Sequence, residues 1–275
     1  TGGMKWAIQI LSWAATLVVA RILSPSDSGL MGMAAVYLGL VTLVNEFGLT
    51  AAILRHRDLT EEQIAHVGGF SLLVGLALAA ISVAISPLIA RFYAERAVAT
   101  IIAVLSLNFV FGSLGVLPRS LLARDLSYPR LAMIDGITNV VQMLTMLTLA
   151  IAGFRYMALV FGSLVGSACG ALLALWWRPH RLAWPSSLRS IGSTLHVGWH
   201  IVVGRLAWYT YNTADFAVVG RVLGKQVLGA YTLGWEIATM PVERISALVS
   251  SVTPGVFSAV QHDMVALRRY FLGVV

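Results

Sequence analysis

The stretch VVARILSPSDSG, residues 18–29, has a counterpart in VVGRVLGKQVLG, residues 218–229. Each copy has two valines, a small residue, an arginine, a further aliphatic pair and, after five less constrained residues, a glycine. Arg21 therefore corresponds to Arg221, and Gly29 corresponds to Gly229. Two segments with the same residues at the same spacing predict an internal repeat. The sequence between them indicates which kind of structural unit is repeated.

The sequence between the two copies is strongly apolar. Of the 275 residues, 58% are apolar and 11% are charged, whereas about a quarter of the residues of a soluble domain carry a charge. With a mean hydropathy of +0.83, the composition predicts a membrane protein. The net charge of +7 fits basic residues in cytoplasmic loops and does not require a nucleic-acid partner. The single cysteine, Cys169, excludes a cysteine-based metal site.

Apolar runs about 20 residues long with few Asp, Glu, Lys or Arg residues predict membrane-crossing helices. The chain contains eight such runs, and a ninth begins near residue 267. They cover residues 5–22, 29–53, 67–90, 98–121, 131–152, 156–177, 197–219 and 229–256. None of them alternates polar and apolar residues as strands of outer-membrane barrels do. The predicted fold class is therefore an all-α polytopic helix bundle.

Six predicted spans separate the two copies of the phrase, so both copies lie at the same side of the membrane. This spacing predicts two parallel six-helix repeats around a central cavity, an arrangement found in transporters. The first bundle covers residues 1–178, a cytoplasmic linker covers 179–196, and a partial second bundle covers 197–275. Because the chain ends inside an apolar run, we expect the second bundle to be truncated. If the N-terminus is cytoplasmic, the cytoplasmic loops contain more Lys and Arg residues than the outer loops. This distribution favours a cytoplasmic N-terminus.

Several spans carry polar side chains at helical spacing, although a polar group inside a bilayer costs a few kcal/mol unless it pairs or meets water. These side chains predict a hydrophilic cavity. The candidate substrate-binding residues are Arg205, Tyr209, Asn212, Asp215, Glu236, Glu46, Asn45, Asp135 and Asn139. The alternative is structural pairing between helices, for example of Arg205 with Asp215 or Glu236. Asp135, Glu46 or Asp215 could instead bind a coupling proton or sodium ion.

The ends of the spans carry further signals. Arg21 and Arg221 are predicted to anchor or cap helix ends, and Gly29 and Gly229 to allow close packing where the next helix begins. Thr60 followed by Gln63 is a capping-box pattern, which predicts that a helix begins at Thr60. No catalytic motif occurs: the chain has neither a GxxxxGK[ST] phosphate loop nor a GxSxG elbow, and no metal-binding motif. We expect neither an enzyme nor a metalloprotein.

Three phrases resemble a known family. ARILSPSDSGLMGMA (20–34), LPRSLLARDLSYPRLA (117–132) and residues 222–258, which end in VTPGVFS around Pro254, are similar to oligosaccharide flippases of the polysaccharide-export family. That family belongs to the multidrug, oligosaccharidyl-lipid and polysaccharide exporter superfamily, and the resemblance implies a MATE-like fold of twelve or more helices, of which about a third lies outside this chain.

The resemblance also implies a function. It implies an inner-membrane flippase that moves an undecaprenyl-pyrophosphate-linked oligosaccharide, such as an O-antigen, capsule or exopolysaccharide repeat unit, by alternating access. Polysaccharide polymerase and glycosyltransferases would be its partners. On this interpretation Arg205 holds the diphosphate through its planar donors, and Asp215 and Glu236 bond sugar hydroxyls. The alternatives are a multidrug or organic-cation antiporter of the same superfamily and a membrane-embedded glycosyltransferase or polymerase.

Overall fold

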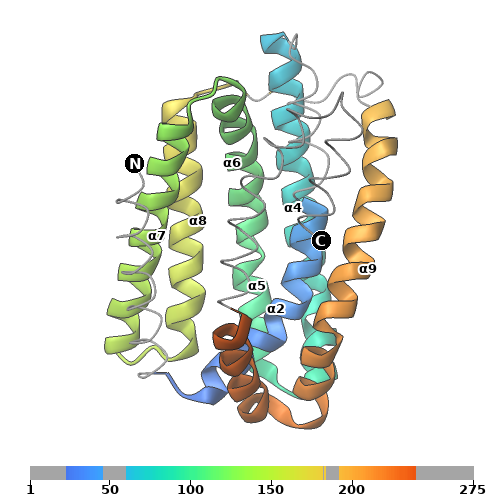
Figure 1. The fold of residues 1–275 in the computed structure, drawn as a ribbon, viewed down its shortest axis with the longest axis vertical. Coiled ribbons are helices and arrows are strands. Elements are labelled where there is room, and N and C mark those ends of the chain that lie inside the picture. Colours follow the sequence, from blue (N-terminus) through green and yellow to red (C-terminus); the bar gives the residue numbers. More distant parts are fainter. Residues whose placement is uncertain (1–22, 46–59, 182, 184–191, 240–275) are drawn as a thin grey trace, which may run out of the picture. The chain divides into compact units, whose positions relative to one another are not determined.

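The computed structural model describes residues 23–45, 60–181, 183 and 192–239, with the backbone alone for 61 and 192–202. The described residues are almost entirely helical and contain no strand (Figure 1). The chain divides into a unit that runs to Ala230 and a second unit from Tyr231 onward. The first unit contains all the helices that are named below.

Helix α2 covers Pro25–Asn45 and begins four residues before the span predicted from the apolar run. Its start is fixed by a capping box. The Ser24 hydroxyl accepts a hydrogen bond from the Asp27 N–H at 3.3 Å, and the Asp27 carboxylate accepts one from the Ser24 N–H at 3.1 Å. Pro25 occupies the first helical position, where its missing N–H costs nothing.

Helix α4 covers Glu61–Tyr93 and is longer than the predicted span, 67–90. The predicted capping box is confirmed: Thr60 accepts from the Gln63 N–H, and the Gln63 side chain accepts from the Thr60 N–H at 3.0 Å. The helix ends at Ala94, whose φ of 57° is left-handed and turns the chain back. Polar residues in the first turns therefore extend the helix beyond its apolar part.

The single span predicted over 98–121 is confirmed as one candidate membrane span, Arg96–Arg124, although the helix is interrupted once within it. Helix α5 covers Arg96–Leu105 and helix α6 covers Leu107–Arg124. The break lies at Ser106, whose hydroxyl donates to the Ala103 carbonyl at 2.7 Å. Serine competes for backbone groups in this way and interrupts helices.

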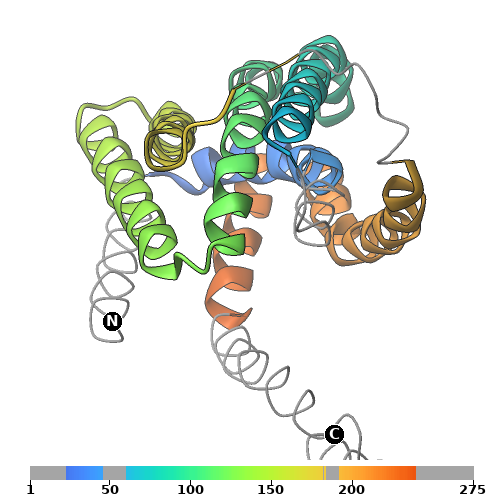
Figure 2. The same ribbon diagram turned by 90° about the horizontal axis from the view of Figure 1, so that it is seen from above.

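Helices α7, Tyr128–Ile151, and α8, Tyr156–Trp177, form an antiparallel pair and lie side by side in both views (Figures 1 and 2). The bounds of α8 agree with the predicted span. Three glycines of α8 at intervals of four face α7: Gly162 meets Met146, Gly166 meets Gln142 and Gly170 meets Thr138. Such a stripe of small residues lets two helices approach closely in a membrane.

Helix α9 covers Gly192–Val222 and begins five residues before the predicted span. Gly224, with a φ of +81°, makes the turn into the helical residues 224–239. Five stretches of described helix are long and apolar enough to cross a membrane: Pro25–Asn45, Glu62–Tyr93, Arg96–Arg124, Tyr128–Ile151 and Tyr156–Trp177. The predicted spans at 5–22 and beyond 267 lie outside the described residues, as does the span at 229–256 from residue 240 on.

Candidate functional site

Helix α9 packs against α2, and Tyr209 provides the central contact. Its hydroxyl donates to the Ala35 carbonyl of α2 at 3.0 Å. The ring lies against Gly39, so closely that a Cβ at Gly39 would overlap it. Tyr209, a predicted cavity residue, therefore also joins two helices that lie far apart in the sequence.

The other predicted residues of α9 differ in exposure. Arg205, one turn before Tyr209, is exposed, whereas Asn212 and Asp215 are half-buried. The Asn212 amide donates to the Trp208 carbonyl of its own helix at 2.8 Å. Arg205 thus extends a guanidinium group from a face of α9 that the described part of the chain leaves uncovered.

A second charged group lies between α6 and α7. The Arg119 guanidinium donates to the Asp135 carboxylate at 2.7 Å, and the side chains are 36% and 57% exposed. Both residues lie within candidate membrane spans. Asn139, one turn beyond Asp135, is also exposed. Charges exposed on membrane-spanning helices avoid a large cost only if they face water, a polar ligand or each other.

The pairing of Arg119 with Asp135 leads to a test by double-mutant cycle. Arg119→Ala and Asp135→Ala should each lower the thermal stability of the detergent-purified protein, and the double variant should lose less than the sum. The expected coupling is about 1 kcal/mol, because interhelical polar contacts in membranes are modest. Arg130→Ala, at an exposed arginine of α7, is the control and should show no coupling to Asp135→Ala. Additive losses for Arg119 and Asp135 would contradict an energetically coupled pair.

The remaining predicted residues have less defined surroundings. The Asn45 amide makes a long 3.5 Å contact with the Phe109 carbonyl of α6, which fits the structural alternative. Glu236 is exposed and belongs to the second unit. Glu46, Arg21 and Pro254 lie outside the described residues. Among the residues that the structure describes, no group of three or more His, Cys, Asp or Glu could hold a metal ion.

One end of the first unit holds several contacts that sequence reasoning did not find. The Lys225 ammonium lies 2.8 Å from the Glu95 carboxylate, between α4 and α5. The Arg155 guanidinium lies 3.4 Å from the buried carboxylate of Asp27. Arg221 stacks over the Phe92 ring, with its Cζ 5.7 Å from the centroid. The sequence placed these basic residues in loops on one side of the membrane but gave no sign of their partners.

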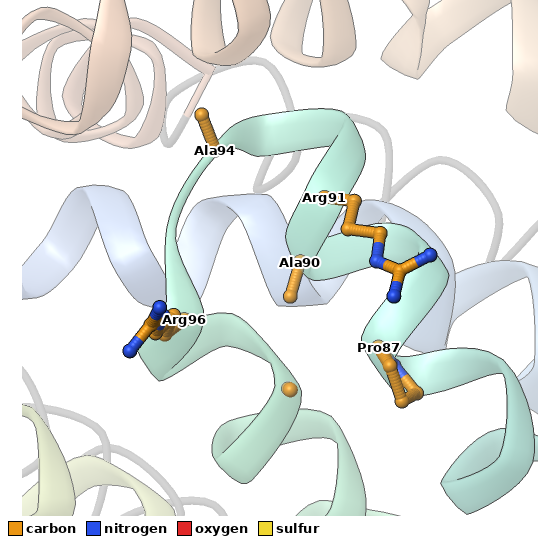
Figure 3. A pocket seen from close by; sticks show the side chains of 6 residues that line it. Pro87, Ala90, Arg91, Ala94 and Arg96 are labelled. Carbon is orange, nitrogen blue, oxygen red and sulfur yellow. The ribbon is translucent and has the colours of Figure 1, made fainter.

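A pocket of about 490 Å³ lies beside the turn between α4 and α5 (Figure 3). Its lining consists of alanines and a proline together with two arginines: Pro87, Ala90, Arg91, Ala94, Arg96 and Ala99. Figure 3 shows the Arg91 and Arg96 guanidinium groups pointing in different directions, so they do not converge on one point. None of the predicted site residues lines it.

Long apolar helices packed through small residues, with charged side chains exposed on their faces, define a multi-pass membrane protein. A family model described as polysaccharide biosynthesis protein matches residues 18–275, and the chain belongs to this family.

Relatives of this family are known from several bacteria. The chain is 26% identical, over 84% of its length, to the teichuronic acid biosynthesis protein TuaB of Bacillus subtilis, and covers 48% of that protein. It is 25% identical, over 98% of its length, to the lipopolysaccharide biosynthesis protein WzxC of Escherichia coli, of which it covers 56%. It is 23% identical, over 92% of its length, to the succinoglycan biosynthesis transport protein ExoT of Rhizobium meliloti, of which it covers 51%.

The chain thus spans about half the length of the curated relatives that it matches. No solved structure shows a significant match to it. The chain is therefore a multi-pass membrane protein of the polysaccharide biosynthesis protein family.

Proposed function

We propose that this chain is part of a flippase that moves an undecaprenyl-pyrophosphate-linked oligosaccharide across the bacterial inner membrane. The observation that carries the proposal is the family match over residues 18–275. The exposed charges on the helices support it, because a lipid-linked sugar needs a hydrophilic route through the bilayer. The substrate would be an O-antigen, capsule or exopolysaccharide repeat unit.

The proposed mechanism is alternating access between two parallel six-helix repeats. The first repeat covers 1–178, the linker 179–196 and the beginning of the second repeat 197–275, with the N-terminus in the cytoplasm. No covalent bond of the substrate changes, so the protein is not an enzyme in this proposal. The sugar passes between the repeats while the polyprenyl tail stays in lipid. Glycosyltransferases supply the substrate and a polymerase consumes it.

In this proposal the exposed Arg205 binds the diphosphate of the substrate. A guanidinium group offers parallel N–H donors that match two phosphate oxygens, and such charge-assisted bonds are stronger than neutral ones. Sugar hydroxyls would bond the remaining polar residues that line the passage. These residues are Asp215, Asn212, Tyr209, Glu236, Glu46, Asn45, Asp135 and Asn139.

A coupling ion, either a proton or sodium, would bind one of three carboxylates of the passage: Asp135, Glu46 or Asp215. Asp135 already has a cationic neighbour in Arg119, with which it forms an ion pair. Export that continues after collapse of both ion gradients would remove this part of the proposal.

The role of Arg205 is tested by replacement in cells whose polysaccharide export depends on this protein. Arg205→Ala should lower export at least about tenfold, because a charged hydrogen-bond pair contributes about 1.5–3 kcal/mol. Arg205→Lys keeps the charge but loses the planar donors, so we expect intermediate export. Surface polymer is measured with a glycan-specific antibody, and protein levels by immunoblot.

The matched control is Arg181→Ala, at an exposed arginine of the predicted linker, which should export normally. Normal export by both Arg205 variants at normal protein levels would overturn the role of Arg205. If deletion of the gene left surface polysaccharide unchanged while abolishing ion-driven efflux of a cationic dye, the antiporter alternative would replace the flippase.

A further inference from the structure

The two copies of the repeated phrase meet each other in the structure. Gly29 lies against the backbone of Lys225, and Gly229 lies against the backbone of Pro25, so closely that a Cβ on either glycine would overlap the facing carbonyl oxygen. A Cβ on Gly229 would also lie 2.9 Å from the backbone nitrogen of Gly29. The contact is reciprocal at one register: Gly29 corresponds to Gly229, and Pro25 corresponds to Lys225.

Two side-chain contacts flank this backbone contact. The Lys225–Glu95 ion pair, at 2.8 Å, joins the second copy to the turn between α4 and α5. Arg221 stacks on Phe92 at the end of α4. In Figure 1 the start of α2, the α4–α5 turn and the end of α9 gather at the lower end of the first unit. Two reciprocal glycine contacts and two contacts of cationic side chains therefore join the second copy to the rest of the first unit at this end.

These contacts differ from the packing inside the N-terminal helices. The α7–α8 interface uses three glycines along its length, whereas α2 meets the second copy through Gly29 and Gly229 and, one turn further on, through Met33 beside Gly220. The side chains of Lys225 and Glu95 remain 38% and 27% exposed, so water can solvate them when they separate. A partly exposed ion pair contributes about 1 kcal/mol or less, which a conformational change can overcome.

We propose that residues 25–29 and 225–229, with the Glu95–Lys225 ion pair, form a gate that closes one end of the passage and must open in each transport cycle. This inference rests on the proposed function, since it assigns the gate to that passage. With a cytoplasmic N-terminus, the gate faces the periplasm. Glu95 and Lys225 act as positioning residues that hold the gate closed and make no contact with substrate.

The test locks the gate covalently. Glu95→Cys and Lys225→Cys are introduced together into a Cys169→Ser background, which removes the native thiol, and the intact cells are treated with a short bis-methanethiosulfonate cross-linker. Cross-linking should reduce surface polysaccharide at least about tenfold, and dithiothreitol should restore it. The control pair is Asp125→Cys with Arg178→Cys, which replaces a 3.4 Å ion pair within the N-terminal helices and should export normally when cross-linked.

The outcomes separate the gate from the function. If the Glu95–Lys225 pair cross-links fully and export stays normal, the gate is refuted while the flippase stands. If the cysteine variants without cross-linker export normally but both cross-linked pairs block export, the block is not specific to this contact, and the gate is also refuted. If cells lacking the gene export normally, the flippase itself fails.

Discussion

Gly166→Leu is expected to prevent most of the protein from reaching a folded state in the membrane. A Cβ at this position would lie 2.8 Å from the Gln142 Cβ of α7, and leucine adds three further carbons. Because Gly166 is the middle member of the stripe, α7 and α8 cannot separate locally without losing the contacts at Gly162 and Gly170. Overpacking of this kind costs about 3 kcal/mol. The measurement is the yield of monodisperse protein after detergent extraction, by fluorescence size-exclusion chromatography.

The matched control is Val165→Leu on the adjacent position. Val165 is 39% exposed and points away from the stripe, so an added methylene group should leave the yield unchanged. A yield of Gly166→Leu as high as that of the unchanged protein would show that α7 and α8 do not approach as closely as the structure indicates. Equal losses would point to a general intolerance of α8 to larger side chains.

Asp27→Ala should destabilise the start of α2 and lower the melting temperature of the purified protein. Asp27 is 2% exposed, accepts hydrogen bonds from both the N–H and the hydroxyl of Ser24, and lies beside Arg155. Alanine removes the cap and leaves the Arg155 guanidinium without this carboxylate, which should cost about 2 kcal/mol. Differential scanning fluorimetry in detergent measures the change.

Asp27→Asn separates the two contributions. The amide oxygen can still accept from Ser24, so this variant should keep most of the capping energy and lose only the attraction to Arg155. Asp125→Ala, which removes a half-exposed carboxylate from the pair with Arg178, should lower the melting temperature much less. If Asp27→Ala were no worse than Asp125→Ala, burial of the capping box would have no energetic consequence.

The helices that have a charged residue just outside each end were predictable from the sequence. The apolar run between Arg155 and Arg178 is one span, and α8 covers it with the predicted bounds. The start of α4 was equally accessible, since Thr60 and Gln63 form a local pattern. The start of α2 at Pro25 was missed because the search followed apolar runs, although the sequence SPSD contains a capping signal of the same kind. The break at Ser106 was not predicted, because it lies inside an apolar run and no charged residue marks the position.

The partners of charged side chains were not predictable. Arg119 lies near the end of the predicted span 98–121, and an apolar run by itself does not show which group such a charge meets. Its partner Asp135 lies on the next helix, 16 residues further on, and only their packing shows that the two charges meet. Likewise, the repeat predicted that Gly29 and Gly229 occupy equivalent positions, but equivalence does not state that the two sites touch.

The length of α4 offers an experimental handle. Its 33 residues extend about 50 Å at 1.5 Å per residue, while the hydrocarbon layer is about 30 Å thick. The helix is therefore longer than the hydrocarbon layer is thick, and the Glu62 side chain in its first turn is 86% exposed. A fluorophore or epitope attached at Glu62 would be held at the end of α4, outside its apolar segment. Such a label can report the sidedness of the protein in intact vesicles.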